Sequence, residues 1–130
     1  MNFDKNDRSI DWLQKICLDH RDERDWKQFH NPKDLALALS IEVAEVLEHF
    51  RFKDNKEISD YLSDDENKKK VGYEVADILY FVLLLSDEIG LDLVKSFKEK
   101  MKISKDKYPV HLAKGCNKKY NLLRENKEKQ

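Results

Sequence analysis

Apolar and polar positions along most of this chain follow a helical repeat. Apolar residues recur every three or four positions between residues 10 and 17 and again between residues 32 and 50. A repeat of that period gathers apolar side chains on one face of a helix. The pattern predicts four main helices: from near Asp7 to about residue 20, from Pro32 to about Phe50, over residues 67–89, and from Asp92 to just before Pro109.

Residue types that favour helix ends support these bounds. Asn31 precedes the second helix and is a good N-cap. Ser63 followed by Glu66 has the spacing of a capping box, which would open the third helix. Gly90 is a natural residue to end that helix, and Asp92 is positioned to cap the fourth. The polar stretch over residues 51–66 is predicted to be a connection with one short helical turn.

The composition favours helices over sheets. Among 130 residues there are three glycines and two prolines, too few for the turns of a β-rich fold. We predict an all-α domain over residues 1–112, a four-helix antiparallel bundle, followed by a basic, partly disordered tail over residues 113–130. The third helix is apolar nearly all round between residues 75 and 85. One small bundle cannot cover that surface, so we expect a homodimer or homotetramer.

Charge and cysteine usage exclude several classes of protein. The net charge is -1, so there is no global basic field to attract nucleic acid. Cys17 and Cys116 show no disulfide or zinc spacing. No secretory leader is visible at the N-terminus, and the longest apolar run is too short to span a membrane. We therefore expect a cytoplasmic protein without membrane or nucleic-acid partners.

Two pairs of carboxylates lie on predicted apolar helix faces. Glu42 and Glu45 are three residues apart on the second helix, and Glu74 and Asp77 have the same spacing on the third. Burying four negative charges together is costly unless a cation lies between them. Oxygen ligands suit Mg²⁺, with Mn²⁺ as a possible substitute, better than zinc or copper. A nucleotide phosphate could supply further ligands to such an ion.

Other interpretations of these acidic pairs remain open at this stage. Most such pairs on helices are solvated surface charges, in which case the chain would be a non-catalytic helical dimerisation module. A ferritin-like di-iron site also uses inward carboxylates, but it needs a Glu-x-x-His motif, which this sequence lacks. Saturable stabilisation by Mg²⁺ would separate an enzyme from a dimerisation module.

Several segments together resemble one family. "ERDWKQFHNPKDLALAL", "EVAEVLE", "YEVADILYF" and "KMKISKDKYPVHLAKGCNKKY" resemble the all-α nucleotide pyrophosphohydrolases of the MazG-like type, and most closely their dCTP pyrophosphatase branch. The resemblance implies hydrolysis of a nucleoside triphosphate to a monophosphate and pyrophosphate. It also implies a house-cleaning role towards non-standard or pyrimidine deoxynucleotides such as dCTP. A related activity on phosphoribosyl-ATP fits these segments less well.

The resemblance also implies roles for individual residues. Metal ligands would be Glu42, Glu45, Glu74 and Asp77, and we expect Glu45 to be the general base as well. Substrate-binding residues would be Trp26, His30, Phe52, Phe81, Ser104 and Lys107. Three positions depart from the branch: Cys17 replaces a histidine near the base, Phe81 replaces a tyrosine, and Ser104 replaces an asparagine. These departures bear on base preference more than on the chemistry.

Overall fold

The structure, a computed structural model, describes residues 9–125, which form helices and turns with no strand among them. The all-α class predicted from the sequence is confirmed. Within this described range no helix is both long and apolar enough to cross a membrane. The chain divides into two compact units, Met1–Leu91 and Asp92–Gln130.

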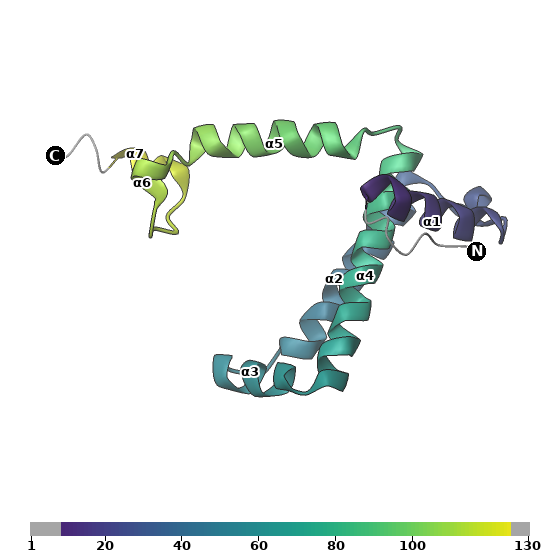
Figure 1. Cartoon of the computed structure of the whole chain (residues 1–130), viewed down its shortest axis with the longest axis horizontal. Coiled ribbons are helices and arrows are strands. Elements are labelled where there is room, and N and C mark those ends of the chain that lie inside the picture. Colours follow the sequence, from purple (N-terminus) through teal and green to yellow (C-terminus); the bar gives the residue numbers. More distant parts are fainter. Residues whose placement is uncertain (1–8, 126–130) are drawn as a thin grey trace. The chain divides into compact units, whose positions relative to one another are not determined.

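The first unit is organised around two long helices. Its elements are α1 (Ile10–Asp22), the 3-10 helix η1 (Trp26–Phe29), α2 (Pro32–Phe50), α3 (Asn55–Ser63) and α4 (Asp65–Glu88). The most extensive packing is between α2 and α4, which lie side by side (Figure 1). Both α1 and α3 pack against α4. Because the short α3 connects the long pair, α2 and α4 run antiparallel, as the sequence predicts.

Most of the predicted helix ends agree with the structure. Asn31 caps α2, its Oδ1 accepting a hydrogen bond of 2.9 Å from the Asp34 backbone N–H. Asp92 caps α5 in the same way through the backbone N–H of Lys95, at 2.9 Å. Gly90 follows α4 with a φ of 66°, a left-handed conformation that suits glycine. The start predicted near Asp7 lies outside the described residues, and α1 begins at Ile10.

The predicted capping box at Ser63 and Glu66 is wrong. The Ser63 hydroxyl donates back to the Asp60 carbonyl of α3 at 2.7 Å, so it does not cap the next helix. Asp64 caps α4 instead, since its Oδ1 accepts from the Asn67 backbone N–H at 2.9 Å. A complete capping box does occur one element earlier, at the start of α3. That element has 9 residues rather than the single turn that we predicted.

The second unit contains α5 (Leu93–Lys107), α6 (Val110–Ala113) and α7 (Tyr120–Glu125). α6 packs against α7, the rings of Tyr108 and Tyr120 meet edge to face at 6.2 Å, and Leu123 is buried. The predicted tail thus contains helical segments up to Glu125, and residues 126–130 lie outside the described part. The division into residues 1–112 and 113–130 stays a prediction. So does the bundle of four helices, because its expected fourth member, α5, belongs to this second unit.

The apolar core of the first unit is small. Its buried apolar residues are Cys17 from α1, Leu35 from α2, and Leu83 and Leu84 from α4. α1 is fixed to α4 by polar contacts as well, since the Gln14 side chain donates to the Leu83 carbonyl at 3.2 Å. Large apolar residues remain exposed on α2: Leu37, Ile41, Val43 and Leu47. These side chains are the exposed apolar face of α2.

Candidate metal and nucleotide site

The acidic pairs predicted on two helices come together in the structure. Glu42 and Glu45 of α2 and Glu74 of α4 each offer a carboxylate oxygen, and these oxygens all lie within 4.8 Å of one another. The i, i+3 spacing places the first two on one face of α2, and the antiparallel packing brings α4 alongside that face. Carboxylates that are far apart in the sequence therefore lie close together in the fold and form a cluster of three.

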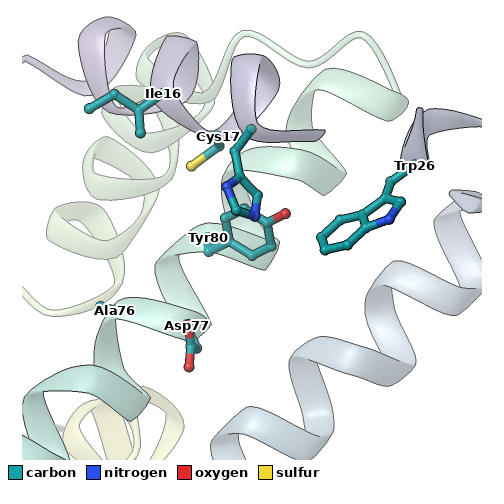
Figure 2. Close-up of a pocket in the computed structure, with 7 residues that line it drawn as sticks. Ile16, Cys17, Trp26, Ala76, Asp77 and Tyr80 are labelled. Carbon is teal, nitrogen blue, oxygen red and sulfur yellow. The ribbon is translucent and has the colours of Figure 1, made fainter. Parts of the chain in front are cut away.

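Asp77 lies one turn beyond Glu74 on α4 and close to the same cluster. Its negative charge contributes to raising the pKa of both Glu42 and Glu74. It also lines the cavity that is drawn in Figure 2. All four predicted ligands thus share one region, and their role as ligands remains a prediction.

The cluster is electrostatically unfavourable as it stands. Loss of solvation is the largest cause of the raised pKa of Glu42, followed by hydrogen bonding to Glu45 and the nearby negative charges. The pKa of Glu74 is raised first by its hydrogen bond with Glu45, then by desolvation and the charges of Glu45 and Asp77. Two carboxylates can share a hydrogen bond only if one is protonated. The site therefore favours either an extra proton or a cation.

The arrangement of donors fits a hard divalent cation. Oε2 of Glu42 is buried and has no hydrogen-bond partner. None of the salt bridges formed within residues 9–125 involves any of the four acidic residues. An unpaired buried carboxylate oxygen costs free energy, which an ion would offset. A set made only of carboxylate oxygens is the chemistry that Mg²⁺ and Mn²⁺ prefer.

A hydrogen bond between α2 and α3 lies near the acidic cluster. The ring Nδ1 of His49 and the hydroxyl of Tyr61 are 2.8 Å apart, which joins the C-terminal turn of α2 to α3. His49 partly opposes the rise in the pKa of Glu74, so it lies near that carboxylate. No role for this histidine was predicted from the sequence.

An aromatic cavity of about 610 Å³ lies next to the acidic cluster. It is formed by α1, η1 and α4 and is lined by Ile16, Cys17, His20, Trp26, Ala76, Asp77 and Tyr80. Figure 2 shows the rings of Trp26 and Tyr80 bordering one space, with Asp77 on the α4 side of it. The volume is within the range of small-molecule sites. The cavity is acidic at Asp77, and three of its other lining residues are aromatic: His20, Trp26 and Tyr80.

Trp26, predicted to contact the base, lines this cavity, and so does Cys17. His30, also predicted to bind substrate, ends η1, where its backbone N–H donates to the Lys27 carbonyl at 3.0 Å. Phe81 is half-buried and packs edge to face on Tyr80 at 5.1 Å. Neither His30 nor Phe81 is part of the cavity lining.

The remaining predicted substrate residues lie elsewhere. Phe52 is 90% exposed just after α2, with a φ of 62° and the Arg51 guanidinium 4.3 Å from its ring centroid. Ser104 and Lys107 belong to α5 of the second unit, where the Lys107 Nζ lies 5.1 Å from the Tyr120 ring centroid. The contacts of these three residues with substrate stay predictions.

Two of the aromatic residues that line the cavity were not predicted from the sequence. Neither His20 nor Tyr80 was predicted from the sequence to bind substrate. A signal for His20 was available, because it lies three residues after Cys17 and so shares its helix face. Tyr80 follows Asp77 by the same spacing on α4. Recognising either one required knowing that α1 packs against α4.

Comparison with known proteins confirms the family resemblance seen in the sequence. The MazG-like family matches residues 37–123. dCTP pyrophosphatase 1 from Rattus norvegicus and from Homo sapiens is 31% identical over 115 residues, covering 88% of this chain and 68% of each relative. The crystal structure of a pyrophosphatase from Archaeoglobus fulgidus DSM 4304 has a TM-score of 0.72 and 34% identity, over 83% of this chain and 99% of that one. Because the family match spans more than half of the sequence and includes both acidic pairs, this chain belongs to the MazG-like family.

Proposed function

We propose that this protein is a Mg²⁺-dependent nucleoside triphosphate pyrophosphohydrolase. It cuts a (d)NTP between the α- and β-phosphates, giving a (d)NMP and pyrophosphate. Family membership and the pyrophosphatases among its relatives support the reaction class. The observation that carries the proposal is the cluster of Glu42, Glu45 and Glu74, drawn from two helices, with a buried unpaired oxygen on Glu42.

Glu42, Glu45, Glu74 and Asp77 would hold the metal. When bound, Mg²⁺ would neutralise phosphate charge and make a water molecule more acidic. In the reaction a water oxygen forms a bond to phosphorus, and the bridging P–O bond between the α- and β-phosphates breaks. The water proton passes to a carboxylate. Among the three clustered glutamates, Glu45 suits that role because it is exposed, whereas Glu42 and Glu74 are partly buried.

The adjoining cavity is the proposed place for the nucleoside. Asp77 belongs both to the acidic region and to the cavity lining, so a nucleotide with its phosphates at the metal can extend its base towards Trp26. Stacking on an aromatic ring holds any base. The dCTP pyrophosphatases among the relatives support pyrimidine deoxynucleotides, and a house-cleaning role, as the first substrates to test.

The exposed apolar face of α2 supports an oligomer. Four large apolar residues there are half or more exposed: Leu37, Ile41, Val43 and Leu47. A contiguous apolar surface of this kind usually meets another subunit. We therefore infer a homodimer or homotetramer in the cytoplasm, and light scattering should return a multiple of the 15.5 kDa chain mass. The mass of a single chain at micromolar concentration would overturn this inference.

The decisive experiment is a substrate panel with pyrophosphate as the readout. All common NTPs and dNTPs are tested with Mg²⁺ on the wild type, Glu45→Gln and Asp77→Asn. Both variants keep side-chain size and remove a charge, so kcat should fall by at least ~10² on every nucleotide. Glu48→Gln is the matched control, because this exposed residue of α2 pairs with Arg51 at 2.6 Å instead.

Two results would count against the proposal. Equal losses in Glu48→Gln and Glu45→Gln would show that the cluster has no special role. Absence of turnover on every nucleotide, together with no effect of Mg²⁺ on stability, would favour a non-catalytic dimerisation module.

A further inference from the structure

The aromatic end of the cavity contains two polar groups with free hydrogen-bonding capacity. In the described part of the chain, no hydrogen bond is formed by the ring nitrogens of His20 or by the hydroxyl of Tyr80. Both residues are half-buried and line the cavity. Their unpaired polar atoms are not fully buried. They are therefore available to a ligand.

Ring packing holds His20 between the other two aromatic residues. Its ring lies edge to face with Trp26, at 5.6 Å and 74°, and with Tyr80, at 6.0 Å and 88°. The guanidinium of Arg24 lies 5.6 Å from the Trp26 ring centroid, and its Nη1 donates to the His20 carbonyl at 3.0 Å. These contacts restrict the orientation of His20 before any ligand arrives, which is what a selective site requires.

The chemistry of these groups suits a nucleobase edge better than a phosphate. A tyrosine hydroxyl and a neutral imidazole can each both donate and accept a hydrogen bond. Burial is the largest cause of the raised pKa of Tyr80, so its hydroxyl keeps its proton at neutral pH. Cys17 adds only a weak donor. An anionic phosphate would instead be repelled by Asp77 unless a cation lay between them.

Resting on the pyrophosphohydrolase function proposed above, we propose that His20 and Tyr80 determine which base this enzyme prefers by hydrogen bonding to the edge of the base. Trp26 covers the face of the base and holds all bases alike. Selectivity comes from the edge, because a base with the wrong donors and acceptors leaves His20 and Tyr80 unpaired in a partly dry cavity. His20 and Tyr80 are thus specificity residues, distinct from the carboxylates that perform the chemistry.

The test compares His20→Phe and Tyr80→Phe with the wild type. Phenylalanine keeps a ring at position 20 and removes only the hydroxyl at position 80, so packing is largely retained. The measured quantity is the ratio of kcat/KM between the preferred dNTP and the other three. Losing one net hydrogen bond should reduce that ratio by about 3- to 10-fold in each variant. Tyr73→Phe, on the same helix but 60% exposed and outside the cavity, should leave the ratio unchanged.

A binding measurement separates this proposal from the proposed function. Calorimetry with the four α,β-imido dNTPs reports base discrimination without turnover. Wild-type discrimination that weakens in both variants supports the assignment even if no nucleotide is hydrolysed. Turnover by the wild type with an unaltered base ratio in both folded variants would overturn it and leave the pyrophosphohydrolase function intact. If the wild type neither binds nor hydrolyses any nucleotide, both proposals fail.

Discussion

Arg21 of α1 and Asp87 of α4 form an ion pair that fixes α1 to α4. The Nη1 of Arg21 lies 2.8 Å from Oδ2 of Asp87, and the arginine side chain is only 4% exposed. Its Nε also contacts Asp22 at 2.7 Å. These partners raise the pKa of the Arg21 guanidinium above its ordinary value, with the Asp22 hydrogen bond as the largest cause. Because α1 carries Cys17 and His20, this pair also supports one wall of the aromatic cavity.

Removing Asp87 should destabilise the fold. In Asp87→Ala the buried guanidinium loses its partner on α4 and keeps only Asp22, and a buried charge that loses one of its two partners is destabilising. We expect a loss of about 1–3 kcal/mol in the free energy of unfolding, less than for a fully buried pair because Asp87 is 34% exposed. Urea denaturation followed by circular dichroism measures it. Asp22→Ala, which removes the more exposed partner of Arg21, should reduce the free energy of unfolding by less than Asp87→Ala does. A larger loss in Asp22→Ala than in Asp87→Ala would show that the ion pair between α1 and α4 contributes little.

Divalent metal should stabilise the native state through the acidic cluster. A ligand that binds only the folded chain at 100 times its Kd adds about 2.7 kcal/mol. We therefore expect a higher Tm in Mg²⁺ than in chelator for the wild type. Glu42→Gln should lose most of that shift. In chelator it should melt above the wild type, because it removes one repelling charge and its amide can donate to Glu45.

Glu48→Gln again serves as the control for this measurement. It removes a charge from the same helix without touching the cluster, so its response to Mg²⁺ should match that of the wild type. An equal Mg²⁺ shift in the wild type and Glu42→Gln would exclude Glu42 as a ligand.

Without metal, the stability of the wild type should fall as the pH rises above 4.5, the ordinary pKa of a glutamate. In the native state the pKa values of Glu42 and Glu74 are raised above 4.5, the ordinary value that applies to the unfolded chain. Between the unfolded-state pKa and the native-state pKa of each glutamate, the native state therefore binds more protons than the unfolded state. The free energy of unfolding therefore decreases as the pH rises through that range. Asp22, whose pKa is lowered by Arg21, is ionised in both states there and adds no slope. Denaturation in chelator at several pH values tests this, and Glu42→Gln should show a shallower slope than the wild type.

Local sequence signals predicted much of the helical framework and the acidic cluster. The caps at Asn31 and Asp92 depend only on neighbouring residues, so they could be identified without the fold. The spacing of Glu42 and Glu45 likewise fixes a shared helix face. The predicted capping box at Ser63 is wrong, because Ser63 is followed by Asp64, which can also cap a helix. The carboxylate of Asp64 caps α4, while the Ser63 hydroxyl satisfies a carbonyl of α3.

Contacts between distant segments were not predictable in the same way. His20 and Tyr80 are 60 positions apart in sequence, and their rings lie 6.0 Å apart because α1 packs against α4. The local signal for each is only its spacing of three residues from Cys17 or Asp77, which does not by itself indicate ligand binding. Phe52 is 90% exposed in the described chain, and its contact with substrate stays a prediction. Its left-handed backbone conformation follows from the turn after α2.

Base binding and chemistry should separate in Trp26→Ala. Trp26 lines the cavity with 41% of its surface exposed, so a stacked base would cover much of its ring. Removing the indole should weaken nucleotide binding by the ~1–3 kcal/mol that one stacked base contributes. The loss should appear in KM and in calorimetric affinity, with kcat much less affected than in Glu45→Gln, because the carboxylates remain in place. Phe29→Ala is the matched control, since this residue lies on the same 3-10 helix, is 67% exposed and does not line the cavity. Trp26→Ala kinetics that match the wild type on every nucleotide would show that the base lies elsewhere, even if the metal site proves correct.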